Sequence, residues 1–182
     1  MIKKKAGYEY LLAYKITVPI YDLTVKFCER FVRSFRMKEQ MIQAARSGMQ
    51  NIVEGNKQQG MKGYIKLSGI ARGSLEELLK DYHAYARQNN LEIWKTGETG
   101  KIRELEKIWK IVKQNRTLPD KPNFPSLPMS AEKATNLMIT LVNQANYLVD
   151  RLIQSLKEKH QRVGGLTEEL YRKRIKYINQ SQ

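Results

Sequence analysis

Apolar side chains recur every three or four residues along most of this chain, which is the spacing of one face of an α-helix. The first stripe is Ile20, Leu23, Thr24, Phe27 and Phe31. The second is Met41, Ala44 or Ala45, Gly48 and Ile52. The third is Tyr64, Leu67, Ala71, Ser74 or Leu75, Leu78, Tyr82 and Tyr85. No segment shows the two-residue alternation of a strand, so the pattern predicts an all-α protein.

Proline, glycine and polar residues indicate where these helices begin and end. Pro19 follows Thr17 by two residues, which predicts that the first helix starts there with Thr17 as its cap. Gly55 is expected to end the second helix as a left-handed cap. The third helix is expected to run from about residue 62 to residue 88, where Asn89 and Asn90 end it.

A fourth long helix is expected after a proline-rich connection. Residues 118–128 hold four of the five prolines, so they cannot form a helix. Ser130 then begins an incomplete capping box, because Lys133 stands where an acid is expected and Glu132 lies one position early. The stripe that follows is Ala134, Leu137, Met138, Leu141, Ala145, Leu148, Leu152 and Leu156.

These elements predict an up-and-down four-helix bundle over residues 1–160. Residues 91–128 form an inserted connection that contains one short amphipathic helical segment, at 101–114. Gly164 and Gly165 end the fourth helix, and a C-terminal helical extension occupies residues 161–182, with a short helix at 170–178.

Glycines inside the second and third helices predict a close contact between two backbones. Ala44 and Gly48 are four residues apart, as are Gly69 and Gly73, so each pair leaves one helix face smooth. Each interior glycine costs a helix roughly 1 kcal/mol relative to alanine, which close packing would offset. We expect a tight helical hairpin that turns at residues 54–60. The alternative is that these glycines are only tolerated on exposed faces.

Three further residues belong to the predicted hairpin. Glu54 lies in the last turn of the second helix, where the helix dipole disfavours a negative charge. It is therefore expected to clasp the hairpin through Arg72 or through backbone amides, although a catalytic carboxylate is the alternative. Ser74 is expected to pack rather than act as a nucleophile, because it lies within a helix and outside any nucleophile elbow. Gly55, the expected cap of the second helix, is the third of these hairpin residues.

The charge of the chain adds a functional signal to this fold. Lysine and arginine outnumber acids 33 to 18, which gives a net charge of +15, and the excess is spread along the chain. An excess of this size predicts a polyanionic partner on a folded surface, and the alternative is a generally basic proteome. The candidate nucleic-acid-binding residues lie at helix ends and at the hairpin turn: Arg33, Arg36, Lys38, Arg46, Lys57, Lys62 and Lys66.

Little in the sequence indicates catalysis. His83 and His160 are the only histidines and Cys28 the only cysteine, and no metal-ligand spacing appears, so neither a metal nor a cofactor is expected. A lone cysteine excludes an intrachain disulfide. No window approaches the roughly 18 apolar residues of a membrane span. We therefore expect a cytoplasmic protein that is not an enzyme.

Several segments carry a resemblance to a known family. They are 44–47 (AARS), 51–55 (NIVEG) and 70–78 (IARGSLEEL), with a weaker match at 21–27 (YDLTVKF). The chain resembles the small four-helix-bundle proteins that include the 23S rRNA intervening-sequence proteins and the accessory variability proteins of diversity-generating retroelements. The resemblance implies a bundle, a ring-like homo-oligomer with a pentamer as the best single guess, and roles associated with RNA.

Charge and resemblance together lead to one functional hypothesis and its alternatives. The hypothesis is a noncatalytic, oligomeric RNA-binding accessory, with a retroelement reverse transcriptase as a possible partner. One alternative is a protein-only structural or assembly scaffold, and another is an enzyme without a recognisable motif. Binding to nucleic acid should weaken steeply with salt, whereas apolar assembly should not.

Overall fold

The computed structural model describes residues 5–100 and 102–180 of the chain, all in helices, turns and irregular segments. Four long helices carry most of the packing: α1 (Leu12–Phe31), α2 (Phe35–Asn56), α3 (Met61–Gln88) and α6 (Ala131–Val163). Shorter elements are a 3-10 turn η1 (Gly7–Tyr10), α4 (Thr96–Thr99), α5 (Arg103–Gln114) and α7 (Leu166–Gln180). The all-α prediction is confirmed.

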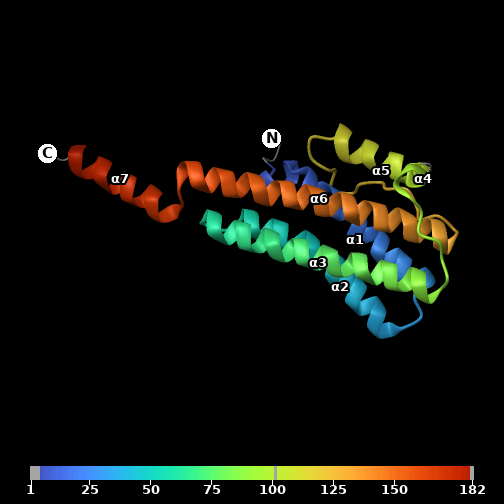
Figure 1. Ribbon diagram of the computed structural model, residues 1–182. Helices are drawn as coiled ribbons and strands as arrows, with labels where there is room; N and C mark the ends of the chain where they lie inside the picture. The colour runs from blue at the N-terminus through green and yellow to red at the C-terminus, as the bar shows by residue number, and fades with distance from the viewer. Residues whose placement is uncertain (1–4, 101, 181–182) are drawn as a thin grey trace.

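The four long helices form the bundle that the sequence predicts (Figure 1). Each packs against two neighbours, α1 on α2 and α6, and α3 on α2 and α6. The predicted stripes point inward, so that Ile20, Phe27, Ile52, Leu78 and Leu137 are all completely buried. An aromatic group closes one end of this core: Phe27 meets Phe31, Tyr82 and Tyr85 with ring centroids 5.0–5.1 Å apart.

The predicted start of the first helix is wrong. α1 begins at Leu12, and Pro19 lies buried inside it. Thr17 is not a cap, because its hydroxyl donates to the Tyr14 carbonyl, 2.7 Å away, within the helix. The helix continues through the proline because Ala13 and Ile16 extend the same buried face toward the N-terminus, although Pro19 deprives one carbonyl of its helical partner.

The inserted connection is fastened to the bundle by polar contacts. Lys15 of α1 is buried and donates from Nζ to the carbonyls of Val112 and Asn115, at 2.8 and 2.9 Å, which fixes the end of α5. Trp94 donates from its indole nitrogen to Glu132, 3.0 Å away. Glu132, displaced from its capping position, thus holds the segment before α4, while Ser130 caps α6 alone by accepting from the Lys133 amide.

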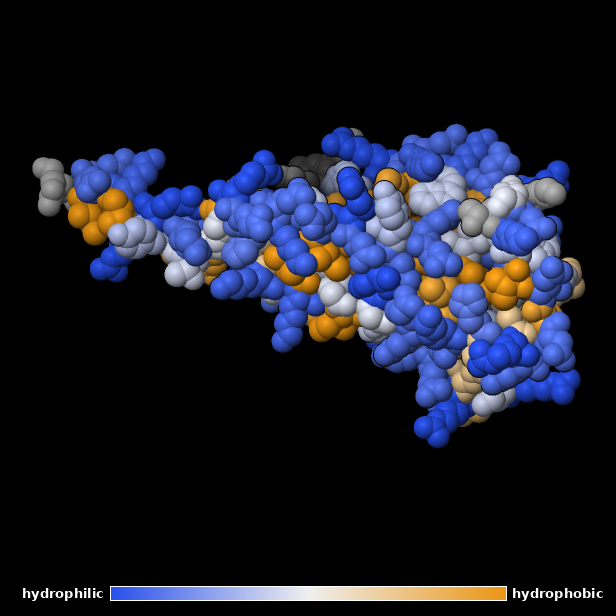
Figure 2. Space-filling view, viewed as in Figure 1, coloured by the Kyte–Doolittle hydropathy of each residue, from blue (hydrophilic) through white to orange (hydrophobic). Residues whose placement is uncertain are grey.

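The C-terminal helix α7 extends beyond the bundle (Figure 1). It begins after Gly164, whose φ of +80° turns the chain at the end of α6, and it is longer than the predicted 170–178. Every described residue from Glu168 to Gln180 is exposed. Its exposed apolar side chains include Leu170, Tyr171 and Ile175, and Figure 2 shows a hydrophobic patch at the end of the molecule that α7 forms.

Candidate nucleic-acid interface

The α2–α3 hairpin sets the positions of the candidate residues. A Cβ atom placed on Gly48 would lie 2.8 Å from Cγ and Cδ2 of Leu75, and one on Gly55 would lie 2.7 Å from Cδ2 of Tyr64. Both distances are shorter than side chains tolerate, so these glycines let the helices approach. Ala44 is buried beside them, and the hydroxyls of Ser47 and Ser74 are hydrogen-bonded at 2.9 Å. Close packing is confirmed at these positions.

Two other glycines that were predicted to pack inside the hairpin lie on its outer surface. Gly69 and Gly73 are exposed, and a Cβ atom on either would meet nothing within 4 Å, so their predicted role in hairpin packing is wrong. Both fall on the outward face of α3, because the buried residues of that helix occupy the opposite side. Gly55 is not a left-handed cap: it lies inside α2, which ends one residue later.

The predicted clasp by Glu54 is also absent. Its side chain is exposed and forms no hydrogen bond or ion pair with the residues that the structure describes. Arg72 is occupied elsewhere, since it donates to Glu76 at 2.9 Å and to both carboxylate oxygens of Asp150 at 3.0 and 3.1 Å. Arg72 therefore joins α3 to α6 rather than to α2.

The structure divides the candidate basic residues into two groups. Arg33, Arg36 and Lys38 lie where α1 turns into α2, at the end of the bundle that also holds the start of α6. Lys57, Lys62 and Lys66 lie at the hairpin turn. The 22 residues of α2 separate the groups by about 33 Å, and Arg46 is exposed between them.

These basic residues are not neutralised by neighbouring acids. None of Arg33, Arg36, Lys38, Arg46, Lys57, Lys62 and Lys66 forms a side-chain hydrogen bond or ion pair with another residue in the described part of the chain. All are exposed except Lys38, which is half-buried. Surface lysines outside this set do pair, as Lys173 does with Glu169 at 2.6 Å. These unpaired lysine and arginine side chains are available to an external anion.

At the hairpin end, lysines and glycines share one surface. Lys62, Lys66, Gly69 and Gly73 follow each other at intervals of four, three and four residues, which places them on one outward face of α3. Glu168, at the start of α7, has a pKa lowered mainly by backbone hydrogen bonds and slightly by Lys62. The glycines therefore leave the helix backbone open beside two lysines.

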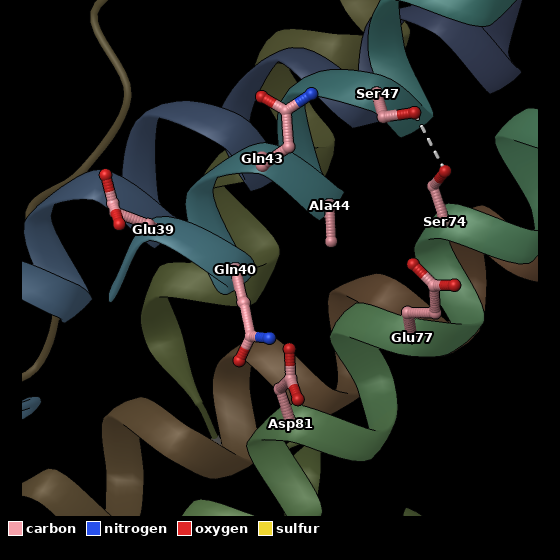
Figure 3. Close-up of a pocket in the computed structure, with 8 residues that line it drawn as sticks. All are labelled: Glu39, Gln40, Gln43, Ala44, Ser47, Ser74, Glu77 and Asp81. Carbon is pink, nitrogen blue, oxygen red and sulfur yellow. Dashed lines mark hydrogen bonds between the residues drawn. The ribbon is translucent and has the colours of Figure 1, made fainter. Parts of the chain in front are cut away.

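An acidic groove lies between the two basic groups, on the α2–α3 surface (Figure 3). Its charged side chains are Glu39, Glu77 and Asp81, and the Ser47–Ser74 hydrogen bond lies at its other end. Burial raises the pKa of the Asp81 carboxyl, and the Glu77 carboxylate adds to the shift. This groove was not predicted from the sequence, although Glu77 and Asp81 are four residues apart on one helix face.

The described residues contain no group of three or more histidine, cysteine or acidic side chains that could hold a metal ion. Tyr64, Tyr82 and Tyr85 are packing residues, as expected: Tyr82 is fully buried and its hydroxyl lies 2.9 Å from that of Thr24. None of the described helices is both long and apolar enough to cross a membrane.

A family model described as 23S rRNA-intervening sequence protein matches residues 9–109. The chain belongs to this family. The match to the 23S rRNA-intervening sequence proteins runs from η1 into α5, so it contains both basic groups, the hairpin glycines and the acidic groove. The helices α6 and α7 lie beyond it. No curated protein and no solved structure matches the chain.

Proposed function

We propose that this protein is a noncatalytic RNA-binding accessory that acts as a homo-oligomer in the cytoplasm. One observation carries the proposal: basic side chains that pair with no acid in the described part of the chain gather at both ends of α2, in a chain of net charge +15. Lysine and arginine side chains that are not already paired can displace counterions from the RNA phosphates without first breaking an ion pair within the protein.

The binding surface would be discontinuous in one subunit. The acidic groove of Glu39, Glu77 and Asp81 lies between the basic groups, and its carboxylates would repel a phosphate backbone that followed α2. RNA would therefore contact the two ends of a subunit separately. In an oligomer each end would be repeated around the assembly axis, so one RNA could contact several subunits through phosphates and with little sequence preference.

The finer role follows from the family resemblance. An oligomeric ring, with a pentamer as the best single guess, would present the repeated basic ends to a folded RNA. Such an accessory could assist a retroelement reverse transcriptase and its template RNA. The alternative is an intervening-sequence protein with another task. A reverse-transcriptase gene next to the gene of this protein would favour the first role.

Filter binding of a structured RNA across a salt series tests the proposal. The triple variant Arg33→Glu, Arg36→Glu, Lys38→Glu and the triple variant Lys57→Glu, Lys62→Glu, Lys66→Glu should each weaken binding. Each lost phosphate contact should also lower the salt slope by roughly one. The control is Arg172→Glu with Lys176→Glu on α7, which should weaken binding far less. Absent binding at low salt, or unchanged affinity in both triple variants, would contradict the RNA-binding role.

A second candidate function, a protein-only scaffold, is favoured by α7. Its exposed apolar side chains lie on a helix that extends beyond the bundle: Leu166, Leu170, Tyr171, Ile175, Tyr177 and Ile178. An amphipathic helix of this kind normally packs its apolar face against another protein surface. A scaffold would assemble at high salt and show no affinity for RNA.

A further inference from the structure

A hollow of about 800 Å³ opens at the turn between α1 and α2. Its walls come from three helix ends: the last turn of α1, the first turns of α2 and the end of α3. This volume lies within the range of small-molecule pockets, roughly 300–1,000 Å³, and is sufficient for one nucleotide. The hollow contains two of the candidate nucleic-acid-binding residues, Arg33 and Lys38.

The charged groups of this hollow favour an anion. Its lining includes Arg30, Arg33 and Lys38 but a single acid, Glu29. Arg33 lies close enough to the Tyr85 hydroxyl to oppose the rise in its pKa that burial causes. Arg33 and Lys38 have no acidic partner within the described part of the chain. A phosphate between them would therefore be attracted by two positive charges that no carboxylate neutralises.

A flat surface lies beside these charges. The Arg30 guanidinium lies over the Phe31 ring, 5.6 Å from its centroid, and donates to the carbonyls of Leu127 and Pro128 at 3.4 and 3.3 Å. Phe31 in turn contacts the core ring of Phe27, with centroids 5.1 Å apart. The Phe31 ring and the two carbonyls therefore hold the Arg30 guanidinium in place. The bases of single-stranded RNA stack on guanidinium planes.

The third wall offers hydrogen-bonding groups. Gln88 and Asn89, at the end of α3, line the hollow and are exposed. The Asn89 amide donates to the Tyr85 carbonyl at 2.8 Å, so its side-chain oxygen remains available as an acceptor. The amide of Gln88 adds both a donor and an acceptor, which suits the polar edge of a nucleobase without selecting one base strongly.

Building on the proposed RNA-binding function, we propose that this hollow holds one unstacked nucleotide of a single-stranded RNA. The phosphate lies between Arg33 and Lys38, and the base stacks on the Arg30–Phe31 pair with its edge toward Gln88 and Asn89. A duplex keeps its bases paired and stacked, so it can reach the two charges but not the flat surface. The site is thus expected to distinguish single-stranded from double-stranded RNA.

The test uses a single-stranded ten-nucleotide RNA that carries one 2-aminopurine, and a blunt RNA duplex of equal length. Wild-type protein should raise the 2-aminopurine fluorescence, because the base leaves the stack of its neighbours, and should bind the single strand more tightly than the duplex. Arg30→Lys keeps the charge but removes the plane, so it should abolish this rise in fluorescence and weaken single-strand binding about fivefold or more, since stacking contributes about 1–3 kcal/mol per base. Duplex binding should remain within twofold.

Matched charge variants separate this site from general attraction. Arg33→Gln with Lys38→Gln should weaken single-strand binding at least tenfold, whereas Lys62→Gln with Lys66→Gln at the other end should leave the rise in fluorescence intact. An unchanged rise in Arg30→Lys, or equal losses of single-strand and duplex affinity in that variant, would overturn the nucleotide site and leave the RNA-binding function standing. Absence of binding to either RNA at low salt would overturn both.

Discussion

Leu75 of α3 lies directly over the backbone of Gly48 in α2, so close that a Cβ atom on the glycine would be 2.8 Å from Leu75 Cγ. The contact ties the two helices that present the candidate basic residues. Gly73, only two residues from Leu75, faces open space. The two glycines look equivalent in the sequence, and their opposite surroundings lead to opposite predictions.

Gly48→Ala should destabilise the protein, whereas Gly73→Ala should stabilise it. The new methyl group at residue 48 must displace Leu75 or α3, and overpacking of this kind typically costs about 1–3 kcal/mol. At residue 73 the methyl group enters open space and relieves a glycine penalty of up to about 1 kcal/mol. Urea denaturation of both variants measures the difference, and a midpoint that rises in both would contradict close packing at Gly48.

The sequence predicted the bundle because helical periodicity depends on local spacing, which the stripes from Ile20 to Leu156 keep throughout. It could not assign faces to single glycines, because Gly48 and Gly73 have similar neighbours along the chain and differ only in the helix opposite them. The partner of Glu54 was predicted wrongly for a related reason. Arg72 pairs with Asp150, which lies 78 residues after Arg72 in the sequence. The hollow at the α1–α2 turn needs three helix ends to meet, which spacing alone does not reveal.

Lys15→Met should destabilise the attachment of α5. The Lys15 ammonium is the donor to two carbonyls at the end of α5, and leaving such buried acceptors without partners costs about 1–3 kcal/mol. Amide hydrogen exchange should therefore accelerate in α5 more than in α2 or α3. Lys26→Met is the control, because Lys26 is an exposed residue of the same helix and should change stability by less than about 0.5 kcal/mol. Equal exchange in both variants would contradict this role.

Cys28 should be chemically silent in the folded protein. Burial raises the pKa of its thiol to about 12, so at pH 8 only about one molecule in ten thousand carries the reactive thiolate. Modification by a thiol reagent at pH 8 should be very slow until denaturant is added. Rapid modification of the native protein would show that the α1–α2 packing opens readily.

The same shift gives a pH dependence with a definite sign. The unfolded thiol ionises near pH 8.5, while the folded thiol keeps its proton up to about pH 12. The unfolded state therefore binds fewer protons in this window, and stability falls as the pH rises above about 8.5. Cys28→Ala should lose less stability than wild type between pH 8 and pH 10. Parallel pH profiles in the two proteins would contradict a protonated, buried thiol.

The final prediction concerns α7 and assembly. Six of the fifteen residues of this helix are apolar and exposed. Packing against a second copy of the chain would cover them, since the bundle of their own subunit does not. Light scattering at micromolar concentration should therefore show an oligomer, and a variant that ends at Gly164 should show a smaller mass while its bundle keeps its helical signal. Lys176→Gln changes only the polar face and should keep the full mass. A full-length monomer would contradict assembly altogether. An oligomer that survives the truncation would instead assign the contacts to the bundle, where Gly69 and Gly73 leave α3 open to close approach.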